Sequence, residues 1–129
     1  MTLRCLLVDD NAGFLEAARV LLDRQGLDVV GLASNSTEAL RLTKEVLPDV
    51  ALVDIDLGNE SGFDLVRLLS ERGGMEPSRV ILISTHSEED FADLIGQSPA
   101  LGFLSKSDLS AAAVRDLVKG ARGDTSPRF

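Results

Sequence analysis

A short apolar run that ends in two acids stands near the start of the chain, Leu6-Leu7-Val8-Asp9-Asp10. Similar runs recur along the sequence, and the whole set covers residues 3–8, 27–33, 50–54, 80–84 and 100–105. Runs of this length are too short for buried helices, and most lack the strict alternation of a half-exposed strand. They therefore predict parallel strands that are buried on both faces.

The segments between these runs have the periodicity of helices. Apolar residues recur at helical spacing within residues 14–22, 39–46, 65–69, 91–95 and 109–118. Asn35 and Glu38 have the spacing of a capping box at the start of the second helix. Five strands alternating with five helices predict an α/β fold, a (βα)5 doubly wound parallel sheet. A chain of 129 residues favours the flavodoxin-like strand order 2-1-3-4-5.

The composition indicates one globular domain and disfavours several classes of partner. The chain has 21 Asp and Glu and 13 Lys and Arg. The resulting net charge of −8 disfavours direct contact with nucleic acid or an anionic membrane. No apolar run approaches the ~20 residues of a membrane span, and no signal peptide is recognisable, so we expect a cytoplasmic protein. The single cysteine, Cys5, excludes an internal disulfide and is expected to be buried. We expect one domain over residues 1–121, followed by a C-terminal tail or truncated linker over 122–129.

Three carboxylates follow the first and third predicted strands. Asp9 and Asp10 come after the first strand, and Asp54 closes the third. In the order 2-1-3-4-5 these strands are neighbours where the order reverses, and ligands bind beyond the carboxyl ends of such strands. Clustered like charges oppose ionisation unless a cation offsets them, and Mg²⁺ accepts one or two carboxylates with waters and phosphate oxygens. The pattern predicts a Mg²⁺ site. The alternative is that Asp9 and Asp10 begin a loop and cap the first helix, and that Asp54 is another loop acid.

A hydroxyl and an ammonium group follow the last two predicted strands. Ser84 closes the fourth strand and Lys106 follows the fifth. Both residue types suit the equatorial oxygens of a transferring phosphoryl group, because that chemistry depends on positioning and charge neutralisation. Each residue alone is ordinary at a strand end, but their placement at the same sheet edge as the acids supports a role in binding a phosphoryl group.

The five residues in this order resemble the site of the receiver domain of two-component response regulators, and the resemblance covers residues 3–121. It implies that Asp54 accepts a phosphoryl group from the phosphohistidine of a sensor histidine kinase, giving an aspartyl phosphate. Such a domain catalyses only its own phosphorylation and dephosphorylation. The expected partner is therefore the kinase, and homodimerisation on phosphorylation is left open.

The resemblance also assigns roles around Asp54. It implies that Asp10 binds Mg²⁺ directly, that Asp9 does so through water, and that Asp54 and the backbone carbonyl of Asp56 complete the protein's ligands. Ser84 and Lys106 would contact the phosphate. Phe103 stands at the position of an aromatic switch residue that turns inward when Ser84 moves, and its alternative role is that of a plain core residue.

Several positions depart from the family pattern without removing a reacting group. Gly58 and Ser107 stand where proline is usual, and Ser84 replaces the commoner threonine. Asp56 and His86, each two residues beyond a site residue, match positions that tune the lifetime of the phosphoryl group.

Residues 62–69 and 102–106 resemble receivers of the LuxR/NarL type, which usually precede a helix-turn-helix DNA-binding domain. We therefore expect control of transcription through a DNA-binding domain absent from this chain. The alternative is a stand-alone single-domain regulator.

Other classes of function compete with a receiver. The run Asp54-Ile55-Asp56-Leu57-Gly58 resembles the signature of haloacid-dehalogenase-type phosphatases, although Gly58 does not fit its last position and that signature follows a first strand. A degenerate receiver that only binds a partner is disfavoured by the intact acids. A flavodoxin-like cofactor protein is disfavoured because the first strand leads into two acids rather than a phosphate-binding loop.

Overall fold

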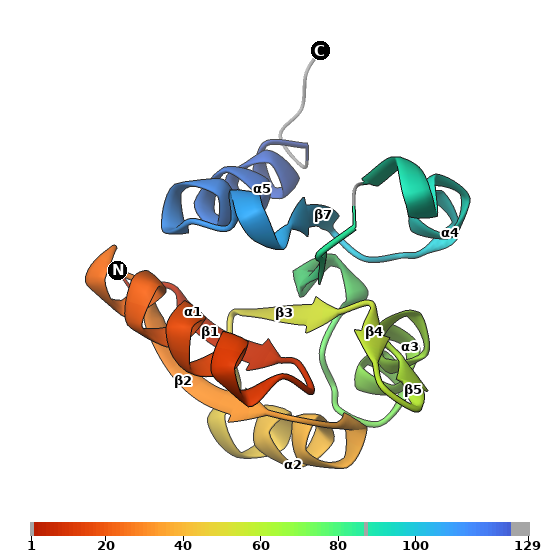
Figure 1. Cartoon of the computed structure of the whole chain (residues 1–129), viewed down its shortest axis with the longest axis horizontal. Coiled ribbons are helices and arrows are strands. Elements are labelled where there is room, and N and C mark those ends of the chain that lie inside the picture. The colour runs from red at the N-terminus through yellow and green to blue at the C-terminus, as the bar shows by residue number, and fades with distance from the viewer. Residues whose placement is uncertain (1, 87, 125–129) are drawn as a thin grey trace.

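Five parallel strands form the central sheet of the computed structural model, which describes residues 2–86 and 88–124. Within that part of the chain they are β1 (Arg4–Val8), β2 (Asp28–Ala33), β3 (Val50–Asp54), β6 (Val80–Ser84) and β7 (Gly102–Ser105). Their order is β2-β1-β3-β6-β7, and each neighbouring pair is parallel. The predicted order 2-1-3-4-5 is confirmed (Figure 1).

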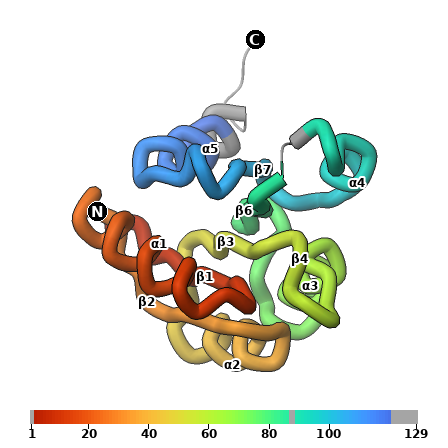
Figure 2. Tube along the Cα trace, in the orientation of Figure 1, coloured from red at the N-terminus to blue at the C-terminus, as the bar shows by residue number. Residues whose placement is uncertain are grey.

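Helices connect the strands as the periodicity predicts. They are α1 (Ala12–Arg24), α2 (Ser36–Val46), α3 (Gly62–Glu71), α4 (Ala92–Gln97) and α5 (Ala111–Asp124), with short 3₁₀ turns η1 (Pro77–Arg79), η2 (Glu88–Phe91) and η3 (Lys106–Asp108). Figure 2 shows α4, β7 and α5 together at one end of the molecule. The C-terminal helix reaches Asp124, and residues 125–129 of the predicted tail lie outside the described residues.

A small antiparallel hairpin was not predicted from the sequence. Its strands, β4 (Asp56–Leu57) and β5 (Glu60–Ser61), lie between β3 and α3. Two-residue strands carry too few positions to show an alternating pattern, which explains why they were not predictable from the sequence.

The sheet separates two apolar layers, because alternate residues of each strand point to opposite faces. One layer joins α2 and α3 to the sheet through buried residues that include Ala39, Leu65 and Val53. The other joins α1 and α5 through Leu22, Val114 and their neighbours. The strands β1, β3 and β6 are therefore buried on both faces almost throughout, as the sequence predicts. No helix within the described residues is long and apolar enough to cross a membrane.

Asparagine side chains begin the first two helices. The Asn11 Oδ1 atom accepts a hydrogen bond from the Phe14 backbone N–H at 3.0 Å, so α1 is capped by Asn11 and not by Asp9 or Asp10. The Asn35 Oδ1 atom accepts from the Glu38 N–H at 2.9 Å, as a capping box requires. The alternative role of Asp9 and Asp10 as helix caps is therefore wrong.

Candidate functional site

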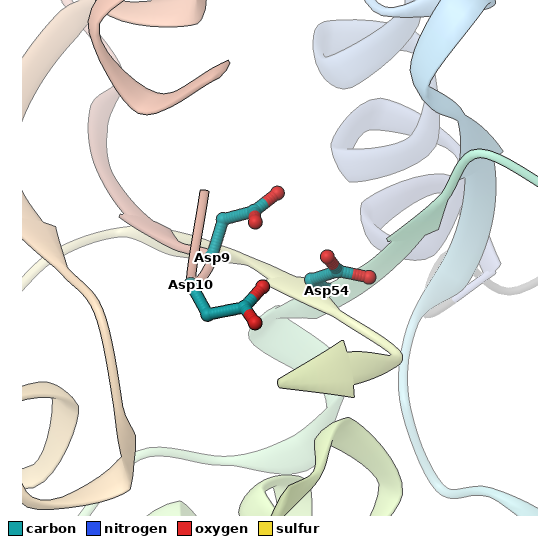
Figure 3. A group of neighbouring side chains, drawn as sticks. All are labelled: Asp9, Asp10 and Asp54. Carbon is teal, nitrogen blue, oxygen red and sulfur yellow. The ribbon is translucent and has the colours of Figure 1, made fainter. Parts of the chain in front are cut away.

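Three carboxylates lie together at the carboxyl ends of β1 and β3. Asp9, Asp10 and Asp54 each offer an oxygen, and these oxygens all lie within 4.8 Å of one another. Figure 3 shows the side chains of Asp9 and Asp10 extending towards the side of Asp54. Asp9 is 1% exposed and Asp54 is 5% exposed, whereas Asp10 lies in solvent. The convergence expected from the strand order is present in the fold.

Lys106 places its ammonium group between two of these acids. Its Nζ atom donates a hydrogen bond to Asp54 Oδ2 at 3.1 Å and lies 2.5 Å from Asp9 Oδ2. The contact with Asp9 is an ion pair outside ordinary hydrogen-bond angles, and it is the charged contact of the buried Asp9 Oδ2 atom. Asp9 Oδ1, in contrast, accepts from the Asn11 N–H at 2.8 Å.

The surroundings of Asp54 favour its neutral form. Burial raises the pKa of this carboxyl group from 3.8 to about 6, and the nearby charge of Asp9 acts in the same direction. The backbone N–H of Asp56, which donates to Asp54 Oδ1 at 3.0 Å, and the Lys106 ammonium oppose this rise. Burial alone would lower the pKa of Lys106, but its contacts with the Asp9 and Asp54 carboxylates outweigh that effect and raise it. The site therefore holds negative charge that is not fully offset, the condition in which a bound cation is stabilising.

The hairpin and the start of α3 hold the segment that follows Asp54. The Asp56 side chain accepts from the Gly58 N–H at 3.1 Å, and Gly58 adopts φ 73, which suits glycine. The Gly62 N–H donates to the Ile55 carbonyl at 2.7 Å. A Cβ atom at Gly62 would lie 2.1 Å from the Asp54 backbone oxygen, so a side chain there would displace the backbone at Asp54.

Ser84 lies on β6, the strand next to that of Asp54, and Phe103 lies on β7, one strand further along the sheet. Ser84 ends β6, is 2% exposed, and its Oγ accepts from the His86 backbone N–H at 3.0 Å. The exposed His86 ring packs edge-on against Phe91, with ring centroids 5.6 Å apart. Phe103, on β7, is half-buried against the layer that contains α2 and α3. Ser84 lies where the sequence predicts, and the switch roles of both residues stay predictions.

One contact in the site was not found from the sequence. Phe14, which was assigned to the apolar stripe of α1, lies beneath the Lys106 ammonium, with Nζ 4.3 Å from the ring centroid. A helical pattern shows that such a residue faces inward, but not that it meets Lys106, which follows β7 and lies 92 residues later in the chain. Cys5 is buried as expected, and burial raises the pKa of its thiol to about 12.

Comparison with known proteins identifies the family. Residues 5–118 match the model of the response regulator receiver domain. The chain is 32% identical over 124 residues to the transcriptional regulatory protein YvfU of Bacillus subtilis, covering 93% of this chain and 61% of that protein. It is 28% identical over 121 residues to the response regulator GacA of Pseudomonas aeruginosa, covering 93% and 54%.

A solved structure of a related receiver domain has the same fold. The signal receiver domain of NarL from Mycobacterium tuberculosis superposes with a TM-score of 0.71 at 31% identity, and the match covers 98% of each chain. The chain spans about half the length of several curated transcriptional regulators that it matches.

Proposed function

Because this chain belongs to the response regulator receiver domain family, we propose that it is a phosphorylation switch in which Asp54 accepts a phosphoryl group from a sensor histidine kinase. The observation that carries the proposal is the position of Asp54 at the end of β3. There it is nearly buried, lies beside two further acids, and accepts a hydrogen bond from Lys106. The family is a signalling family, so we propose that the domain accepts a phosphoryl group and does not turn over a phosphate substrate as an enzyme would.

The residues present fit Mg²⁺. Asp9, Asp10 and Asp54 supply oxygen ligands only, and the Lys106 ammonium contacts two of these three carboxylates, Asp9 and Asp54. Hard divalent cations prefer such oxygen sets. We assign Asp9, Asp10, Asp54 and the Asp56 backbone carbonyl as the groups that would hold the ion. When bound, Mg²⁺ supplies positive charge to the oxygens of the transferring phosphoryl group.

The transfer itself is a displacement at phosphorus. An Asp54 carboxylate oxygen forms the new O–P bond as the P–N bond of the kinase phosphohistidine breaks. The imidazole leaves with the bonding electron pair and takes up a proton from solvent. Lys106 stabilises the charge of the phosphoryl oxygens, because its ammonium group already contacts the acceptor carboxylate.

The conformational response to phosphorylation involves groups on β6 and β7, the two strands on one side of β3. We propose that Ser84 moves its hydroxyl towards the phosphoryl group and that Phe103 turns inward in response. These movements shift the surface of α4, β7 and α5 between two states. We further assign control of transcription through a DNA-binding domain outside this chain. The matched regulators of Bacillus subtilis and Pseudomonas aeruginosa support that assignment, because the match covers only 61% and 54% of their lengths.

Incubation with acetyl phosphate and Mg²⁺ tests the acceptor role. Intact mass spectrometry of the unaltered protein is expected to show a base-labile gain of about 80 Da, the mass of one phosphoryl group. Asp54→Asn is expected to show none. An equal gain in both proteins would overturn the proposal. Repeated turnover of a phosphomonoester by catalytic amounts of protein would favour the phosphatase alternative instead.

A further inference from the structure

The Lys106 ammonium lies between charged oxygens and an aromatic face. Asp54 Oδ2 lies 3.1 Å from Nζ and Asp9 Oδ2 lies 2.5 Å from it, while the centroid of the Phe14 ring lies 4.3 Å away. The face of a phenyl ring carries negative electrostatic potential and attracts a cation within about 6 Å. The residue that follows β1, the last residue of β3 and the first turn of α1 therefore meet at one ammonium group.

Phe14 meets both the apolar layer and the ammonium group. It is half-buried and packs against the edge of the layer to which Leu15, Ala18 and Leu22 of α1 belong, while its ring face lies beside Lys106. The place of the ring is set by the helix start, because the Phe14 N–H donates to the Asn11 cap. The backbone that carries the ring is therefore anchored directly after the acidic pair.

We propose that Phe14 is a positioning residue that holds Lys106 in place for phosphoryl transfer to Asp54. This inference rests on the proposed function. The lysine stem is flexible, and phosphorylation of Asp54 replaces the carboxylate that the ammonium group contacts with phosphoryl oxygens at a different position. The attraction to the ring does not depend on the state of Asp54, so Phe14 retains Nζ beside the site before, during and after transfer. The ring also covers one side of the ammonium group from water.

A series of fluorinated phenylalanines at position 14 separates charge attraction from shape. One, two and three ring fluorines weaken the cation–π attraction stepwise with little change in volume. With acetyl phosphate and Mg²⁺, the rate of Asp54 labelling is expected to fall at each step. The total loss expected for the trifluoro ring, and for Phe14→Leu, is about three- to thirtyfold. Thermal unfolding of each variant checks that the fold is retained.

The same series in a Lys106→Met background provides the decisive control. If Phe14 acts through the ammonium group, the stepwise fall disappears when that group is absent. Phe63→Leu is the matched aromatic control, because this half-buried phenylalanine of α3 packs in the opposite layer, and its rate is expected to stay within twofold.

Two different failures are distinguishable. A flat rate across the fluorinated series in a protein that is labelled at Asp54, or a fall of equal size in the Lys106→Met background, would overturn the role of Phe14 alone. Failure of the unaltered protein to be labelled at Asp54 would overturn the proposed function and this inference together.

Discussion

At the scale of single residues, the site is built from charges that the fold leaves incompletely balanced. Asp54 and Asp9 are nearly buried side by side, and one ammonium group contacts both. Burial disfavours the ionised form of Asp54 and raises its pKa to about 6. An unfolded aspartate titrates near 4, so ionising this residue in the folded protein weakens the folded state.

The first prediction concerns Asp54→Asn without metal. Between about pH 4 and pH 6 the folded protein binds more protons at Asp54 than the unfolded chain, so its stability falls as the pH rises through this window. Above about pH 6 the full penalty is present. In EDTA, the free energy of unfolding of the variant is expected to rise relative to that of the unaltered protein by about 1–2 kcal/mol across this window. This is less than the roughly 3 kcal/mol that corresponds to the whole pKa shift, because solvent reaches the site. Urea unfolding at a series of pH values measures the difference, and a pH-independent difference would contradict the pKa assigned to Asp54.

The individual site residues could largely be located from the sequence, because strand ends are readable and parallel strands share one edge. Asp9, Asp10 and Asp54 follow directly from that reasoning. Phe14 does not, because its contact with Lys106 depends on how far α1 reaches across the sheet towards β7. Neither could the sequence decide between Asn11 and the preceding acids as the cap of α1, since each of these residue types caps helices.

At the scale of elements, the segment between β3 and α3 determines where Asp54 is held. It forms the β4–β5 hairpin, and Gly62 then brings the start of α3 against the backbone of Asp54 and Ile55. The Glu60 carboxylate accepts from the Ser36 N–H at 2.9 Å, which joins the hairpin to the start of α2. Long periodic helices and buried strands were predictable, whereas the two-residue strands of this hairpin show no pattern and its contact with Ser36 joins segments 24 residues apart.

The second prediction tests the close approach at Gly62. A methyl group there would meet the Asp54 backbone oxygen at 2.1 Å, so Gly62→Ala must shift the backbone beside the acceptor. We expect a loss of about 1–3 kcal/mol in the free energy of unfolding, together with slower labelling by acetyl phosphate.

Gly96→Ala is the matched control for this change. Gly96 lies within α4, and a Cβ atom there would meet nothing within 4 Å. Alanine is expected to leave labelling unchanged and to stabilise the protein by up to about 1 kcal/mol. Equal effects of the two substitutions in chemical denaturation would contradict a special role for Gly62.

At the scale of the whole molecule, the sheet order explains why one edge collects the functional groups. With β1 beside β3 and β6 beside β7, the carboxyl ends of four adjacent strands carry Asp9 and Asp10, Asp54, Ser84 and Lys106 in turn. The two apolar layers hold these strands from both sides. A cation bound at this edge would therefore stabilise the entire fold rather than a local loop.

The third prediction follows from that coupling. Mg²⁺ at about one hundred times its dissociation constant is expected to add about 2.7 kcal/mol to stability, because it binds the folded state. Asp10→Asn is expected to remove most of this gain. Asp28→Asn, which changes an exposed acid at the start of β2, is expected to keep it. Thermal unfolding with Mg²⁺ or EDTA measures the effect, and an equal gain in all three proteins would place the ion elsewhere.

Locating the phosphoryl group tests most directly whether Asp54 is the acceptor. The protein is incubated with acetyl phosphate, with Mg²⁺ or with EDTA, and then reduced with borohydride, which converts an aspartyl phosphate to homoserine for identification by tandem mass spectrometry. We predict homoserine at position 54 when Mg²⁺ is present and nearly none in EDTA. Homoserine at another aspartate, or a yield at position 54 that is the same in EDTA, would contradict a Mg²⁺-dependent acceptor at the end of β3.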